Sequence, residues 1–269
     1  METHKIEFYP NRGTGAEGKR ICKLLGRAWP IQPATDFKPD WYRNLDKTYN
    51  HPDRTYRGKT TSPTAKSCPG IFDYMRAGYI VPMWCDIQFK FSKENNKRWD
   101  ASCAEIIVKY LPNMVTKHEY QQVEGAHFLE GGCSTLVKLN SPWYVNVPKG
   151  VSLLFTSPFY HINNDFTVVP GIIDADIEHL PNKEINVFIK LNKPDAIIKL
   201  NQGQPLLQII PFVRTDYEFE NNVPIEIEGE QELDIIETKF KTKIIDQEHD
   251  PIKKLQTNRT PKNYNVKQG

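Results

Sequence analysis

The 269-residue chain carries 35 Lys and Arg against 33 Asp and Glu, which gives a formal net charge of +2 at neutral pH. This balance provides no overall field that would attract an anionic membrane surface or nucleic acid, so a nucleic-acid partner is not indicated. Hydrophobic residues form 39% of the sequence, which is typical of a globular protein and excludes disorder of the whole chain. No stretch approaches the roughly 18 apolar residues of a membrane span, and no secretory signal is visible. We therefore expect a cytoplasmic protein without a membrane partner.

The cysteines and histidines do not form a metal-binding pattern. The five cysteines are irregularly spaced without a Cys-x-x-Cys pair, and the seven histidines contain no His-x-x-x-His or His-x-His. Free cysteine commonly packs as a small buried hydrophobe, so we expect reduced and mostly buried thiols. The sequence predicts no metal site and no resident cofactor. The cysteines are Cys22, Cys68, Cys85, Cys103 and Cys133.

Residues 1–69 are expected to form an irregular arm. Prolines recur from residue 30 to residue 70 among polar and aromatic residues, which discourages helices and central strands. The aromatic residues would anchor the arm on a surface, and we expect Trp41, or Trp29 at the start of this stretch, to be buried. A Gly-x-Gly-x-x-Gly motif at residues 13–18 follows a short expected strand. Because the dinucleotide-binding role of this motif requires a βαβ unit, we interpret it as a glycine-rich turn.

Residues 70–215 are expected to form the main domain, which is mainly β. A short helix is expected at residues 70–77, and alternating apolar residues over 80–91 predict a half-buried strand. From residue 136 onward, many short β-rich runs are separated by Pro, Gly, Asn and Asp. This pattern predicts antiparallel strands up to residue 213, in a barrel or sandwich, with no helix longer than about one turn.

Residues 216–269 are expected to extend from this domain. Residues 221–234 are acidic, and residues 253–269 are basic, polar and nearly free of aliphatic side chains. Such composition is typical of a tail without a core of its own.

Four short elements follow one another in the β-rich region. A Pro-x-Gly turn at residues 148–150 precedes Ser-Pro at 157–158, then Gly-Ile-Ile-Asp-Ala-Asp at 171–176 and Gly-Gln-Pro-Leu-Leu-Gln-Ile at 203–209. Their order and spacing resemble the dUTPase and dCTP deaminase superfamily, whose fold is the β-clip. The resemblance implies a dUTPase-like β-clip barrel and a homo-oligomer, with a trimer as the form that its relatives adopt.

This resemblance also implies candidate functional residues. In the superfamily the first aspartate of the Ile-Asp-x-Asp element positions the attacking water, so Asp174 would inherit this catalytic role beside Asp176. A carboxylate bonded to water can act as a general base. Ser157, His161 and Gln208 lie in or next to the matching elements and are candidate binding residues. The alternative for the two aspartates is structural, because carboxylates at a strand edge accept backbone hydrogen bonds and hold turns.

The chain departs from the superfamily where phosphate would bind. The superfamily uses the arginine of a Pro-Arg-Ser element for a bidentate phosphate contact, whereas residues 157–161 here contain no arginine. No Lys or Arg occurs between Leu154 and Leu180, and no glycine-rich closing motif follows Phe212. Phosphate binding is therefore disfavoured unless a second subunit supplies the cationic groups.

A second resemblance covers more of the chain, from Cys68 to Phe212. The segments CPGIFDYMRAGYIVPMWCDIQF, AHFLEGG, GIIDAD and GQPLLQIIP are similar to a domain family found in bacteria and tailed phages. This resemblance implies that these residues form one unit, but it implies no activity. His127 matches one of its elements and is a candidate binding residue, with a packed structural histidine as the alternative.

We therefore interpret the chain as a non-catalytic β-clip protein that serves as a binding or assembly subunit, in a phage virion or a host cell. Extended ends without a core gain order by lying on a partner, so other assembly subunits are expected partners beside further copies of the chain. The alternative is a divergent nucleotide hydrolase or deaminase-like enzyme that uses Asp174. Mg²⁺ would be a cofactor only in that case.

Overall fold

The computed structural model divides into two compact units, Met1–Thr215 and Asp216–Gly269. The acidic segment and the basic tail expected from the sequence lie outside the described residues. The structure describes residues 5–10, 13–50, 61–91, 99–118, 120–130, 132, 136–161, 163–177, 183–193 and 196–218.

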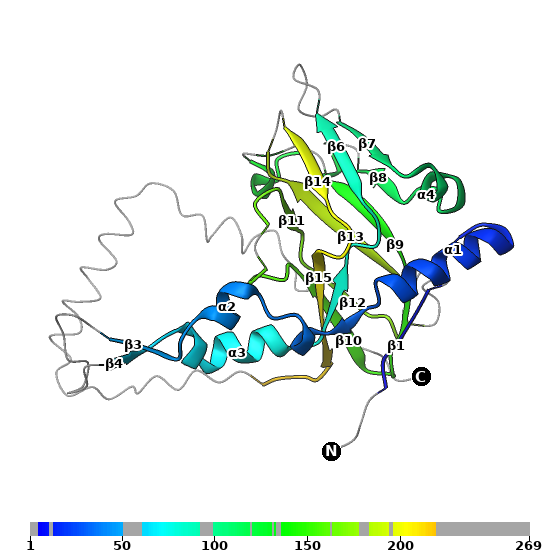
Figure 1. The fold of residues 1–269 in the computed structure, drawn as a ribbon. Helices are drawn as coiled ribbons and strands as arrows, with labels where there is room; N and C mark the ends of the chain where they lie inside the picture. The colour runs from blue at the N-terminus through cyan, green and yellow to red at the C-terminus, as the bar shows by residue number, and fades with distance from the viewer. Residues whose placement is uncertain are drawn as a thin grey trace, which may run out of the picture. The chain divides into compact units, whose positions relative to one another are not determined.

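The first unit is mainly β, as predicted (Figure 1). One five-stranded sheet has the order β1-β9-β13-β11, with β8 also paired to β9. Each of these strands pairs antiparallel with its neighbour. Its strands are β1 (Glu7–Pro10), β8 (Val115–Lys117), β9 (Val137–Asn146), β11 (Phe166–Val168) and β13 (Glu184–Leu191).

A second five-stranded antiparallel sheet has the order β12-β10-β15-β5-β2. Its strands are β2 (Gln32–Pro33), β5 (Tyr79–Pro82), β10 (Val151–Thr156), β12 (Gly171–Ile173) and β15 (Pro205–Val213). Smaller pairings complete the β structure: β14 (Ile197–Leu200), β6 (Ile87–Phe91) and β7 (Trp99–Cys103) form one sheet, and β3 (Thr48–Asn50) and β4 (Thr61–Pro63) form another.

The prediction of antiparallel strands over residues 136–213 is confirmed, and no helix occurs there among the described residues. The expected barrel takes the form of open sheets, because β11 and β12 are edge strands of three residues that pair on one side within the described ranges. Strand β13 shows why the prediction succeeds. Its alternate residues Ile185, Val187, Ile189 and Leu191 are buried, as a period of two requires. They join Leu153 and Ile209 of the second sheet in one core.

The helices are short apart from α1, and no helix in the described ranges is long and apolar enough to cross a membrane. The α-helices are α1 (Gly15–Ala28), α2 (Asp40–Asn44), α3 (Pro69–Arg76) and α4 (Glu105–Tyr110). The 3-10 helices are η1 (Ala34–Asp36), η2 (Ala65–Ser67), η3 (Tyr120–Gln122) and η4 (His127–Leu129). Helix α3 confirms the short helix expected at residues 70–77.

Helix α1 corrects the interpretation of residues 1–69 as irregular throughout. Gly13 and Gly15, with φ of +130° and +65°, form the expected turn, but Gly18 lies inside the helix. A β-carbon at Gly18 would meet the backbone of Gly13 and the carbonyl of Tyr110 at 3.0 Å, so glycine allows a close approach there. Because β1 pairs antiparallel with β9, this strand, turn and helix do not belong to a parallel βαβ unit.

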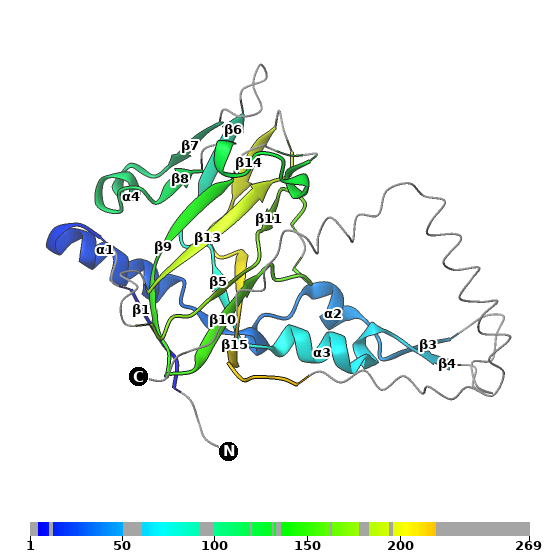
Figure 2. The same cartoon turned by 180° about the vertical axis from the view of Figure 1, so that it is seen from behind.

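The described residues 29–50 and 61–69 contain short elements, of which η1, α2 and η2 lie beside α3 (Figures 1 and 2). The prediction that a tryptophan is buried there is wrong for Trp41, which is 43% exposed. Its indole N–H donates instead to the carbonyl of Tyr160 at 3.0 Å, so the ring is held by one edge. Trp29 is half-buried and its ring lies against Gly203, where a β-carbon would stand 2.3 Å from Trp29 Cζ3.

Candidate functional site

Asp174 and Asp176 lie in the turn after β12, next to the start of β10. The hydroxyl of Ser152 donates to Asp174 Oδ1 at 2.5 Å, and the backbone N–H of Gly150 donates to Asp176 Oδ2 at 2.8 Å. Gly150 belongs to the Pro-x-Gly turn and has φ of +83°, a conformation that glycine adopts without strain. The two aspartates therefore join the turn before β10 to the turn after β12.

Arg214, one residue beyond β15, pairs with both carboxylates. Its Nη1 donates to Asp176 Oδ1 at 2.9 Å and lies 3.1 Å from Asp174 Oδ1, while Nη2 pairs with Asp176 Oδ2. Nη1 also donates to Ser152 Oγ at 3.0 Å. The backbone N–H of Arg214 donates to the carbonyl of Gly150 at 2.8 Å. The end of the last strand is thus fixed to the same two turns.

The charged groups of this cluster pair with one another within one chain. The Asp176 side chain is only 6% exposed, whereas that of Arg214 is 37% exposed. Hydrogen bonds from Arg214 hold the pKa of Asp176 below its ordinary value, against an opposing effect of burial. The same pairing raises the pKa of Arg214. Two carboxylates face one guanidinium, so the cluster keeps a single excess negative charge.

Ser157 and Gln208 make contacts that support the fold. The backbone N–H of Val168 donates to Ser157 Oγ at 3.1 Å, which ties the end of β10 to β11. Gln208 is buried in β15, and its Nε2 donates to the carbonyls of Tyr74 and Ala77 at 2.9 Å each. Both carbonyls lie at the C-terminal end of α3, where intrahelical donors run out, and the Tyr74 carbonyl also accepts from the backbone N–H of Ala77 at 3.1 Å.

His127 lies on the surface, apart from the Asp174 cluster. Its side chain is 93% exposed, and Nδ1 lies 2.9 Å from Glu130 Oε1 within the short η4 segment. Exposed pairs at this spacing contribute little to stability.

His161, in contrast, lies in a groove. The turn from Pro158 to His161 follows β10, and the His161 N–H donates to the Pro158 carbonyl at 2.8 Å. The ring nitrogen Nε2 lies 3.1 Å from the carbonyl of Phe37 in the arm. Burial lowers the pKa of His161, against the Phe37 hydrogen bond, and the positive charge of Arg43 lowers it further. Because Nε2 faces a carbonyl, it carries the proton in the neutral ring, and Nδ1 is an acceptor.

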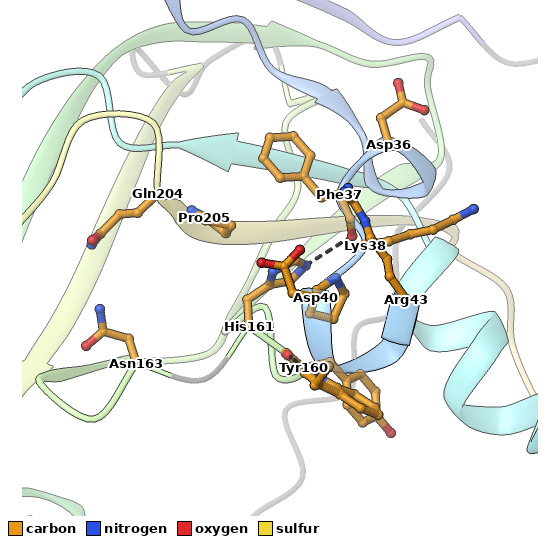
Figure 3. Close-up of a pocket in the computed structure, with 12 residues that line it drawn as sticks. Asp36, Phe37, Lys38, Asp40, Arg43, Tyr160, His161, Asn163, Gln204 and Pro205 are labelled. Carbon is orange, nitrogen blue, oxygen red and sulfur yellow. Dashed lines mark hydrogen bonds between the residues drawn. The ribbon is translucent and has the colours of Figure 1, made fainter. Parts of the chain in front are cut away.

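The groove around His161 has a volume of about 750 Å³. The arm, the turn after β10 and the start of β15 contribute to it (Figure 3). A smaller cavity of about 250 Å³ shares His161 and Asn163 and is also lined by Ser157. The groove is lined by Asp36, Phe37, Lys38, Pro39, Asp40, Trp41, Arg43, Tyr160, His161, Asn163, Gln204 and Pro205.

The structure divides the candidate residues among separate places. Asp174 and Asp176 share one cluster, His161 and Ser157 both line the smaller cavity, and Gln208 is buried beneath α3. Arg214 was not predicted from the sequence, because it lies far outside the stretch from Leu154 to Leu180 that surrounds the two aspartates. Gln204 and Asn163 were not predicted either, because no local pattern in the sequence distinguishes them.

Comparisons with known proteins give matches among solved structures only. No family model matches the chain, and no curated protein matches it. Among solved structures, an EIAV dUTPase is similar over 56% of this chain and 87% of its own, with 15% identity and a TM-score of 0.29. The dUTPase of phage phi11 of S. aureus is similar over 43% of this chain and 99% of its own, with 18% identity and a TM-score of 0.24. The Staphylococcus bacteriophage 80alpha dUTPase is similar over 43% of this chain and 99% of its own, with 14% identity and a TM-score of 0.23.

Proposed function

We propose that the chain is a binding or assembly subunit and that its Ile-Asp-x-Asp element has a structural role instead of a catalytic one. The observation that carries this proposal is the pairing of Asp174 and Asp176 with Arg214 of the same chain. Asp174 Oδ1 accepts from Ser152 and faces the guanidinium, so this oxygen serves contacts within the chain that hold the two turns together.

The same pairing opposes binding of a nucleoside triphosphate. A triphosphate would have to take the guanidinium of Arg214 from Asp176, which is nearly buried. Losing a charge-assisted hydrogen bond of this kind costs about 2 kcal/mol, and the remaining carboxylates would repel the phosphates. The cluster thus favours its own internal pairing over an anionic ligand.

The alternative enzyme would need Mg²⁺, and the donor set does not fit that ion. Mg²⁺ is held by carboxylate oxygens and waters in a near-octahedral arrangement. Here the guanidinium of Arg214 occupies the space between the carboxylates of Asp174 and Asp176. Across the described ranges, no three His, Cys, Asp or Glu side chains are grouped so as to hold a metal ion.

An apolar row on the second sheet, exposed at Ile172 and half-buried at Leu154 and Ile210, supports the assembly role. Ile172 of β12 is 64% exposed and pairs with Leu154, which in turn pairs with Ile210 of β15. Directly opposed residues point to the same face, so these three form an apolar row across three strands. Apolar surface of this kind is typical of contacts between chains. The proposed assembly is a homo-oligomer, with a trimer as the form to test, and a phage virion is its proposed setting.

The test uses the full chain with dUTP and dCTP, each with and without Mg²⁺. We expect no release of pyrophosphate or ammonia and no rise in melting temperature at millimolar nucleotide, since a ligand that binds the folded state raises that temperature. Light scattering on a sizing column is expected to give a mass above 31.2 kDa, the mass of one chain. The proposal is overturned by nucleotide turnover with a thermal shift that disappears in Asp174→Asn. A monomeric mass under all conditions tested would overturn the proposal that the chain forms a homo-oligomer.

A further inference from the structure

Helix α1 carries a local excess of positive charge. It contains Lys19, Arg20, Lys23 and Arg27 but only one carboxylate, that of Glu17, and all four cationic residues are exposed. The neighbouring helix α4 adds one cation and one carboxylate, which leaves this excess of three charges unchanged. Because the whole chain has a net charge of only +2, its overall balance does not reveal this local charge.

The four cations share one side of the helix, which we call the basic side of α1. At about 100° per residue they fall within a sector of about 100°, and at about 1.5 Å per residue they span about 12 Å along the axis. Figures 1 and 2 show α1 extending outward from the sheets with α4 beside it. The basic side therefore faces solvent, outside the sector of the buried residues Gly18, Ile21, Cys22 and Gly26.

The buried side holds the helix in one position. The thiol of Cys22 donates to the carbonyl of Pro142 at 3.3 Å. A β-carbon at Gly18 would lie 3.0 Å from the carbonyl oxygen of Tyr110, and one at Gly26 would lie 3.0 Å from Pro10 Cγ. Packing this close fixes the helix against its neighbours, so the basic side is a preorganised surface.

Most of these charges are not neutralised within the chain. Glu17 pairs with Arg20, whose Nη2 lies 2.7 Å from Glu17 Oε1. In the part of the chain that the structure describes, Lys19, Lys23 and Arg27 have no acidic partner. Lys23 is four residues from both Lys19 and Arg27, and like charges at this spacing destabilise a helix. Anionic groups of a partner would relieve that repulsion.

The composition of the basic side distinguishes between anionic partners. The centres of protein–protein interfaces are depleted of charged residues, lysine among them, whereas here Leu24 is the one large apolar residue of α1 that is exposed, at 51%. A helix that lies on a membrane needs a free apolar side, and that side of α1 is buried in the core. Protein–nucleic acid interfaces are strongly positive, and their Lys and Arg side chains contact phosphates. The basic side of α1 fits this last class.

We propose that the basic side of α1 binds the phosphate backbone of a nucleic acid. Lys19, Lys23 and Arg27 each contact a phosphate, and Arg20 exchanges Glu17 for a fourth. Phosphate contacts carry no sequence information, so the binding is independent of sequence, with a dissociation constant of about 10⁻⁴ to 10⁻⁶ M at physiological salt. This inference goes beyond the proposed assembly role, because it concerns a separate surface and a different partner.

The experiment uses the full-length chain and fluorescein-labelled DNA of mixed sequence, as a short duplex and as the corresponding single strand. Fluorescence anisotropy at about 50 to 200 mM salt measures the association constant K. Four phosphate contacts predict a slope of log K against log salt of about −3.6 for the duplex and about −2.8 for the single strand. Tighter binding of either form supports the proposal and identifies that form as the preferred source of the phosphates.

Matched variants separate local charge from total charge. Lys19→Gln/Lys23→Gln removes two cations and leaves good helix formers at exposed positions. DNA binding should weaken about tenfold or more, and the slope for the duplex should become shallower by about 1.8. Lys47→Gln/Lys199→Gln removes the same charge at exposed positions outside α1 and should keep both the affinity and the slope. Equal melting temperatures of the three proteins show that the fold is kept.

The proposal is overturned if neither DNA form binds at the lowest salt concentration, if the α1 variant keeps its affinity and slope, or if the control variant loses as much affinity. Poly-glutamate and vesicles of phosphatidylcholine with phosphatidylglycerol represent an acidic protein and an anionic membrane. Tighter binding of either one than of both DNA forms would also overturn it. The dUTP and dCTP test and the sizing measurement do not depend on this result.

Discussion

Gly78 lies so close to the carbonyl of Ile209 that a β-carbon at position 78 would stand 1.9 Å from that oxygen. Gly78 also has φ of +69°, which L-residues with a β-carbon rarely adopt. It joins the end of α3 to β5, and the neighbouring Tyr79 is paired directly with Ile209. Glycine at this position therefore allows the chain to leave α3 and enter the second sheet at once.

Replacing this glycine should destabilise the protein strongly. In Gly78→Ala the methyl group cannot be accommodated without moving β15, and the left-handed backbone adds its own strain, so we expect a loss of about 3 kcal/mol or more. Gly70→Ala, inside the preceding helix α3, is the control, because a β-carbon there meets no atom within 4 Å. That change should be neutral or stabilising by about 0.5–1 kcal/mol. Urea denaturation of both variants measures the difference, and equal midpoints would contradict the prediction.

Gln208 links the last strand to the same helix. Gln208→Met keeps the volume of the side chain but removes both hydrogen bonds to the carbonyls of Tyr74 and Ala77, of which the Tyr74 carbonyl still accepts from the Ala77 N–H. We expect a loss of about 1–3 kcal/mol, with faster hydrogen exchange in α3. Gln121→Met, at an exposed position, is the matched control and should change stability by less than about 0.5 kcal/mol. Unchanged exchange in α3 would show that Gln208 does not hold this helix.

The pairing of Arg214 with Asp176 should make the free energy of unfolding depend on pH in the acidic range. Because the pKa of Asp176 is lowered in the folded protein, the unfolded chain binds more protons below the ordinary value of 3.8. The stabilisation is fully present above that value and is lost as pH falls toward the lowered pKa. Arg214→Gln should therefore cost about 2 kcal/mol at neutral pH and reduce this acid dependence.

Lys193→Gln is the control for Arg214→Gln. It removes an exposed ion pair with Asp165, in which the lysine side chain is 53% exposed, and should cost no more than about 0.5 kcal/mol. Stability curves of the three proteins from neutral to acidic pH provide the measurement. If Arg214→Gln kept the same acid dependence as the unmodified chain, the assigned role of the pairing would be wrong.

The β fold could be predicted because its evidence is local. The alternation of Ile185, Val187, Ile189 and Leu191 is visible in the sequence and matches the buried face of β13. Helix α1 was missed because glycines occupy two of its buried positions. Gly18 and Gly26 approach Gly13 and Pro10 closely, so both glycines allow tight packing of α1, and for Gly18 the sequence alone indicated a turn.

The candidate site was less predictable because it depends on long-range register. Arg214 reaches Asp176 from 38 residues away only because β15 is paired with β10, with Val213 opposite Val151. Nothing within the Gly-Ile-Ile-Asp-Ala-Asp element indicates that partner. The groove of His161 likewise forms where the arm meets a turn far along the chain, and no periodic pattern encodes that meeting.

His161 gives the arm a titratable contact. Burial lowers its pKa from the ordinary value of 6.5, so between the two pKa values the unfolded chain binds more protons than the folded one. Stability is therefore greatest above about pH 6.5 and falls as pH drops toward the lowered pKa, by about 1.4 kcal/mol for each unit of lowering. His161→Gln keeps an N–H donor for the Phe37 carbonyl but does not titrate, so this part of the pH dependence should disappear. His127→Gln, at an exposed position, should keep it. Denaturation midpoints at several pH values, with exchange rates of the arm amides, test the prediction, and an unchanged slope in His161→Gln would refute it.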